Sequence, residues 1–227
     1  MSGTVEHTNP KRKSSTLCNI VKTVILSLFL SILIEWLCIT FLWPEEGHLH
    51  SKRVMQEEFS WFSAEFQYSL IYSYPVSLAE NTITILYNWL FIKTGIQRWL
   101  NNPHQSEIGI WLFHYIRAYV ESTLYVIITF VIRLLIIILT SPLFVLAAIV
   151  GFIDGLVQRD IRRFGVGRES AFKYHHAKRA IFPTMILAWI IYLSIPFSIH
   201  PNIILIPAAL LFGLTIALTS ANFKKYL

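Results

Sequence analysis

Four apolar stretches constrain this chain more than any other feature of its sequence. They cover residues 20–43, 119–150, 181–197 and 203–220. The first has about 24 residues, and at ~1.5 Å rise per residue it is longer than the ~30 Å hydrocarbon core of a bilayer. Because lipid offers no hydrogen-bond partners, each stretch must satisfy its own backbone groups by forming a helix. The sequence therefore predicts an all-α, polytopic membrane protein with about four transmembrane helices and additional amphipathic helices.

The composition agrees with this class. Of 227 residues, 55% are hydrophobic and only 14% are charged, and the mean hydropathy is +0.55. A soluble domain of this size would need a more highly charged surface. Cys18 and Cys38 are isolated from each other, so we expect neither a disulfide nor a Cys-x-x-Cys metal motif.

The distribution of basic residues predicts the orientation in the membrane. Residues 1–19 form a basic tail, and residues 221–227 contain two further lysines. Between them, residues 151–180 carry seven Lys or Arg against three acids. Lys and Arg are retained on the cytoplasmic side of a membrane. Four spans place all three basic segments and both chain ends in the cytoplasm, with the net-acidic residues 44–118 outside.

Residues 44–118 are predicted to form periplasmic or interfacial helices. Met55–Tyr72 carries aromatic side chains along one side of a helix, which we expect to end at Pro75. Val76–Ile92 is only marginally apolar and fits a span, an interfacial helix or a buried helix. A fifth span would move the basic residues 151–180 outside, so we prefer four.

Glu35 and Arg133 are the only charges deep within the longer apolar stretches. A central ionisable residue costs about 2.5–3.5 kcal/mol on insertion scales, so it usually has a partner. We expect an intramembrane Glu35–Arg133 pair that joins the first two spans. The alternatives are that each charge reaches water or the membrane surface separately, or that the two line a proton or ion pathway.

Small residues recur every four positions in two parts of the chain. They are Ala147, Gly151 and Gly155 around the end of the second stretch, and Ala209, Gly213, Ala217 and Ala221 around the fourth. Such rows allow helix backbones to approach closely in lipid. We therefore predict helix–helix contacts there, either within the chain or with another copy or partner.

Residues 151–180 are the most distinctive segment. We expect the preceding helix to continue into them and to end at Gly165-Val-Gly167, after which Glu169–Arg179 can form another helix. The resulting amphipathic elbow is predicted to dock a cytoplasmic partner. The candidate docking residues are Asp154, Arg159, Asp160, Arg162, Arg163, Phe164, Arg168 and Glu169. Alternatively, the charges only set topology and contact anionic membrane lipids, at about 1 kcal/mol per basic residue. No recognisable nucleic-acid-binding module is present.

No residue pattern indicates catalysis. His175 and His176 are adjacent, so they lie about 100° apart on a helix and do not form the i, i+4 pair that metals use. His48-x-His50 beside two glutamates fits a solvated loop better than a metal site. Asp154 and Asp160 lack a helical i, i+3 or i+4 relation. We therefore expect no catalytic residues, no cofactor, no bound metal and no enzymatic activity.

The stretch GFIDGLVQRDIRRFGVGRESAFKYHHAKR resembles the integrating-conjugative-element membrane protein family of Gram-negative bacteria. The matching positions include Gly151, Asp154, Gly155, Leu156, Val157, Arg159, Asp160, Arg162, Arg163, Phe164, Gly165, Gly167, Arg168, Glu169, Ser170, Tyr174, His175, Lys178 and Arg179. Elsewhere the similarity lies in hydropathy and length.

The resemblance implies an accessory protein of the bacterial inner membrane that takes part in conjugative DNA transfer through a type IV secretion system. That family is associated with the conjugative coupling ATPase and has no established enzymatic activity, so it supplies no catalytic residues. We therefore expect a non-enzymatic component that docks the coupling ATPase or another transfer protein through its basic segment. The alternatives are a transporter or channel subunit using Glu35 and Arg133, and a membrane enzyme acting on lipid headgroups.

Overall fold

The computed structural model describes residues 16–67, 74–101, 107–164 and 171–223. All regular secondary structure within these ranges is helical, which confirms the predicted fold class. The elements are α1 (Thr16–Phe41), α2 (His48–Glu65), α3 (Pro75–Tyr87), the π-helical segment η1 (Asn88–Lys93), α4 (Ile96–Asn101), α5 (Glu107–Phe164), α6 (Ala171–Ser194) and α7 (Pro201–Ala221).

Four of these helices are long and apolar enough to cross a membrane. The candidate spans are Ile20–Phe41 in α1, Ile116–Phe164 in α5, Tyr174–Ser194 in α6 and Pro201–Ala221 in α7. Their large apolar side chains are often exposed, and Phe29, Ile149 and Leu211 each expose more than half of their surface. Such extensive apolar surface suits contact with lipid and is rare on soluble monomers. The four helices indicate a membrane protein.

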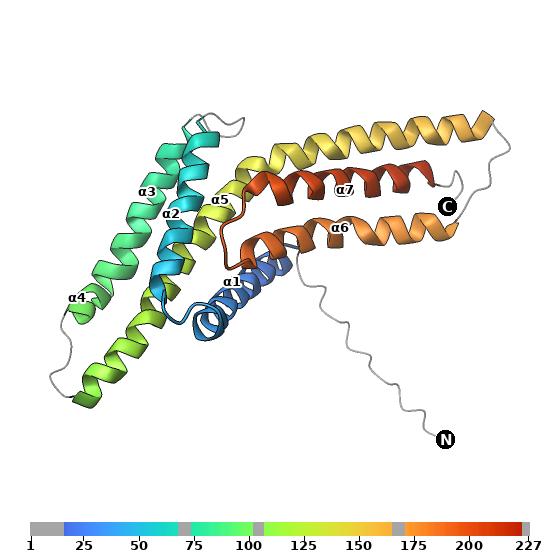
Figure 1. Ribbon diagram of the computed structural model, residues 1–227. Coiled ribbons are helices and arrows are strands. Elements are labelled where there is room, and N and C mark those ends of the chain that lie inside the picture. Colours follow the sequence, from blue (N-terminus) through green and yellow to red (C-terminus); the bar gives the residue numbers. More distant parts are fainter. Residues whose placement is uncertain (1–15, 68–73, 102–106, 165–170, 224–227) are drawn as a thin grey trace, which may run out of the picture.

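The long helix α5 connects two groups of helices (Figure 1). Its 58 residues, at ~1.5 Å rise per residue, extend for roughly 87 Å. The first part packs beside α2 and α3, the later part packs beside α6 and α7, and the helix bends between them. Pro142 lies inside α5 and lacks the N–H that would continue the hydrogen-bond ladder, which favours bending. α1 packs against both α5 and α6.

Several helix boundaries differ from those expected from the sequence. Residues 107–118, expected to lie in a separate helix, join the apolar stretch 119–150 in the single helix α5. As expected, this helix continues past residue 150, and it ends at Phe164, just before the predicted stop. α2 begins and ends earlier than the predicted Met55–Tyr72. Pro75 begins α3 instead of ending the helix before it, because the first turn of a helix needs no backbone donor from proline.

Two rows of small residues bring α5 and α7 into contact. A Cβ atom added at Gly151 would overlap the backbone carbonyl of Gly213, and one added at Gly213 would lie 2.9 Å from the carbonyl oxygen of Ala147. At Gly155 an added Cβ would overlap the Ser220 hydroxyl and the carbonyl oxygen of Ala217 on α7. The predicted helix–helix contact is therefore confirmed, and it lies within the chain.

Candidate functional site

Arg133 on α5 is at the centre of a buried polar cluster that joins three elements. Its side chain is almost completely buried, and Glu58 on α2 is entirely so. Nε and Nη2 donate to the same carboxylate oxygen of Glu58 at 3.1 and 2.7 Å. Nη1 donates to the carbonyl oxygens of Tyr192 (3.2 Å) and Ile195 (2.5 Å), and Nη2 also donates to that of Phe197 (2.9 Å). All five guanidinium N–H groups thus have an acceptor.

The same contacts cap the C-terminal end of α6. The last carbonyl groups of a helix lack intrahelical partners and carry a partial negative charge, which favours a cation nearby. α6 ends at Ser194, and Arg133 binds carbonyl groups just before and just after this residue. The Tyr192 hydroxyl donates to the second oxygen of Glu58 at 3.4 Å. Arg133 therefore holds α2, α5 and the end of α6 together.

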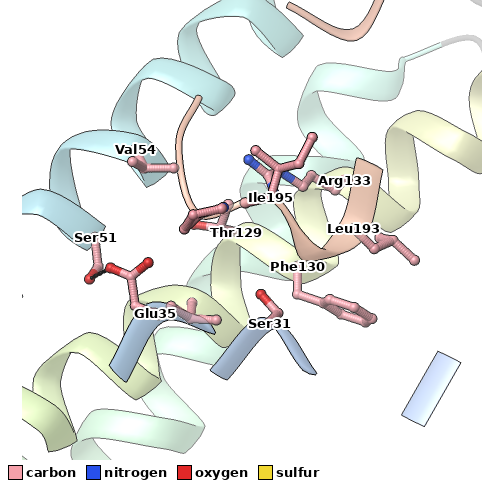
Figure 2. Close-up of a pocket in the computed structure, with 11 residues that line it drawn as sticks. Ser31, Glu35, Ser51, Val54, Thr129, Phe130, Arg133, Leu193 and Ile195 are labelled. Atoms are coloured by element: carbon pink, nitrogen blue, oxygen red, sulfur yellow. Dashed lines mark hydrogen bonds between the residues drawn. The ribbon is translucent and has the colours of Figure 1, made fainter. Parts of the chain in front are cut away.

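Glu35 does not bind Arg133 directly, so the expected pair is replaced by one between Arg133 and Glu58. Instead, the Ser51 hydroxyl lies 2.6 Å from a carboxylate oxygen of Glu35 and 2.7 Å from the hydroxyl of Ser122. Both charges nevertheless line the same small cavity. Figure 2 shows Glu35 with Ser51 on one side of it and Arg133 on the other. Glu35 and Arg133, both in candidate spans, are thus held by protein groups.

Further contacts attach α2 to the connection between α6 and α7, residues 195–200. His50 Nε2 lies 3.2 Å from the carbonyl oxygen of Pro196 and donates to it. At the other end of α2, His200 Nε2 lies 2.7 Å from Glu65. These contacts and those of Arg133 hold α2 against the end of the α6–α7 hairpin where the two helices are connected.

The histidines near the start of α2 lie close to carboxylate side chains. His48 Nε2 lies 2.9 Å from Glu121, whose other oxygen accepts from Arg117 Nε at 3.0 Å. His50 Nδ1 lies 3.7 Å from Glu46. In the ranges that the structure describes, no three His, Cys, Asp or Glu side chains gather closely enough to hold a metal ion.

The basic end of the molecule lies where α5 ends and α6 begins (Figure 1). Of the predicted docking residues on α5, Asp154, Asp160 and Arg163 are exposed, and Phe164 exposes 95% of its surface. Asp160 lies 3.6 Å from Arg163 and 3.9 Å from Arg159. The exposed residues therefore form a mixed apolar and charged surface at the end of α5.

Arg162 has an internal role that the sequence did not reveal. It donates to the carbonyl oxygen of Ala221 and, at 3.2 Å, to the side-chain oxygen of Asn222. It therefore caps the C-terminal end of α7, as Arg133 does for α6. The predicted docking residues Arg168 and Glu169 lie outside the described residues.

Comparison with known proteins identifies a family to which this chain is similar. The family model described as IncC plasmid conjugative DNA transfer protein DtrJ-like matches residues 42–224. This range includes Glu58, Arg133 and the basic end, but not Glu35. No curated protein and no solved structure matches the chain. The match confirms the expected relation to conjugation, here through a family named for a plasmid protein instead of an integrating element. Because the match covers well over half of the sequence, the chain belongs to the DtrJ-like family of conjugative DNA transfer proteins.

Proposed function

We propose that this protein is a non-enzymatic inner-membrane component of conjugative DNA transfer that docks the coupling ATPase of a type IV secretion system at the end of α5. The element that carries it is an integrating conjugative element or a related plasmid. In this proposal the four candidate spans anchor the protein, and both chain ends and residues 151–180 face the cytoplasm. The family match supports the role in DNA transfer.

The observation that carries the docking proposal is the exposed surface at the end of α5. Val157, Ile161 and Phe164 expose 51%, 67% and 95% of their surfaces and are spaced by four and three residues, so they share one side of the helix. Arg163 lies beside them and is more than half exposed. Aromatic side chains and arginine are enriched at protein–protein interfaces, and Phe164 beside Arg163 fits this composition.

Membrane attachment alone does not require this surface. The candidate span in α5 has 49 residues, whereas about 20 suffice to cross a bilayer, so α5 is long enough for its end at Phe164 to project beyond the membrane. Phe164 directly follows a pair of arginines and exposes 95% of its surface. A partner protein that covers Phe164 would remove this ring from water. We assign Arg163 and Phe164 as the first contacts to test, and leave out Arg162 because it caps α7.

Replacing both contacts should weaken binding to the coupling ATPase. We expect the double variant Arg163→Glu/Phe164→Ser to retain at least about tenfold less of the ATPase, since each contact of this kind is worth more than about 1 kcal/mol. The measurement is co-purification of the two full-length proteins from detergent-solubilised donor membranes, together with transfer frequency in mating assays.

The matched control is Arg98→Glu/Trp89→Ser, which changes an exposed arginine and an exposed aromatic side chain near α4. This control should keep normal recovery of the ATPase. Equal recovery with the Arg163→Glu/Phe164→Ser variant and the unaltered protein would rule out docking through the end of α5.

A further inference from the structure

A cavity opens among α5, α6 and α7 at the basic end of the molecule. Its volume is about 530 Å³. Most of its lining is apolar and comes from all three helices. These side chains include Phe152 and Leu156 of α5, Ile181 of α6 and Ile216 of α7. A cavity of this size and lining can accept a hydrocarbon chain.

Two cationic side chains line the same cavity: Arg159 of α5 and Lys178 of α6. Arg159 Nε is buried and donates no hydrogen bond within the described residues. Among the described residues, the carboxylate of Asp160 is 3.9 Å from it, which is too far for a hydrogen bond. Lys178 Nζ lies 5.7 Å from the centre of the Tyr174 ring and forms no ion pair in this part of the chain. A buried donor without a protein acceptor is costly, so Arg159 Nε is available to an acceptor from a ligand.

The cavity also lies at one end of three candidate spans. Its lining comes from the last turns of the spans in α5 and α7 and from the first turns of the span in α6. A ligand in this position would have its apolar part level with the hydrocarbon and its anionic part level with the headgroups. Basic pockets between transmembrane helices bind lipid headgroups in this way.

We propose that this cavity is a binding site for an anionic phospholipid. Its phosphate accepts the free hydrogen bond of Arg159 Nε and pairs with Lys178, while one acyl chain lies along Phe152, Leu156 and Ile181. The apolar lining favours a membrane lipid over a soluble phosphate, because a soluble phosphate would leave that lining uncovered. This site is separate from the docking surface, since Arg163 and Phe164 do not line it.

Native mass spectrometry of the purified full-length protein tests this proposal. The protein in neutral detergent is titrated with phosphatidylglycerol, phosphatidylcholine or glycerol phosphate. We expect saturable binding of one phosphatidylglycerol and much weaker binding of the other two. Removing both cations in Arg159→Gln/Lys178→Gln should lower the affinity about 30-fold, at about 1 kcal/mol per basic residue.

Two further variants keep the result interpretable. Lys178→Gln alone changes an exposed side chain, should leave the fold intact, and should lower the affinity about fivefold. Lys52→Gln/Lys93→Gln removes the same charge from exposed sites elsewhere and should bind lipid normally. The proposed site would be wrong if phosphatidylcholine or glycerol phosphate bound as tightly as phosphatidylglycerol. It would also be wrong if Lys178→Gln or Arg159→Gln/Lys178→Gln bound phosphatidylglycerol with the affinity of the unaltered protein. None of these outcomes bears on docking of the coupling ATPase.

Discussion

Replacing Glu58 with leucine is expected to lower the free energy of unfolding by about 3–5 kcal/mol. Glu58 is fully buried and accepts two of the five hydrogen bonds that Arg133 donates. Without this carboxylate, Arg133 remains buried with an uncompensated positive charge and two unbonded N–H groups. Breaking a buried pair in this way is far costlier than losing a surface pair. Reversible unfolding in detergent, followed by circular dichroism, measures the change.

Three further variants test whether the unpaired Arg133 causes the loss of stability in Glu58→Leu. Glu58→Gln keeps an oxygen acceptor and should be less destabilising than Glu58→Leu. Glu35→Leu removes the carboxylate that contacts Ser51 and should cost only about 1–3 kcal/mol, because Arg133 keeps its partners. Glu80→Leu changes an exposed carboxylate on α3 and should stay within about 0.5 kcal/mol. If Glu35→Leu were as damaging as Glu58→Leu, Arg133 would depend on Glu35 after all.

Gly151→Leu is expected to separate α5 from α7, at a cost of at least about 3 kcal/mol. The backbones are so close here that a single added methyl group would overlap the carbonyl group of Gly213. This neighbour is backbone, so it cannot move aside as a flexible side chain would. Unfolding of the purified variant in detergent measures the loss, and a lower level of the protein in membranes should accompany it.

The neighbouring position provides the control for this prediction. Val150 also lies on α5 but exposes 58% of its surface, so Val150→Leu should change stability by no more than about 0.5 kcal/mol. A Gly151→Leu protein as stable as Val150→Leu would show that α5 and α7 do not pack through this row of small residues.

The sequence predicted the features that depend on local rules. Long apolar stretches become helices because their backbone groups have no other partners in lipid, and this rule yielded all four candidate spans. The four-residue spacing of small residues also predicted a close helix contact. That α7 is the partner of α5 could not be read from the spacing, because both rows suit any close neighbour.

The partner of Arg133 was missed for a physical reason. A partner was expected among the charges of the apolar stretches, whereas Glu58 lies on α2, which is not a candidate span. A signal was nevertheless present. Glu58 lies four residues from both Val54 and Phe62, and these three side chains share the buried face of α2. A carboxylate on the apolar face of an amphipathic helix requires a buried partner.

The capping role of Arg162 could not have been predicted in the same way. It depends on where α7 ends relative to α5, and this follows from the register in which the two rows of small residues meet. In the sequence Arg162 therefore resembles the exposed Arg163, although their environments in the structure differ. Only the folded arrangement separates the residue that stabilises the bundle from the residue that remains available to a partner.

The side of the membrane on which α5 ends can be measured directly. In a Cys18→Ala/Cys38→Ala background, single cysteines are introduced as Phe164→Cys and as Glu45→Cys, at exposed positions on α5 and between α1 and α2. An impermeant thiol reagent is then added to intact spheroplasts. We expect labelling at position 45, and labelling at position 164 only after the membrane is permeabilised. Labelling at position 164 in intact spheroplasts, with position 45 protected, would place the basic end outside the cell and contradict the docking of a cytoplasmic ATPase there.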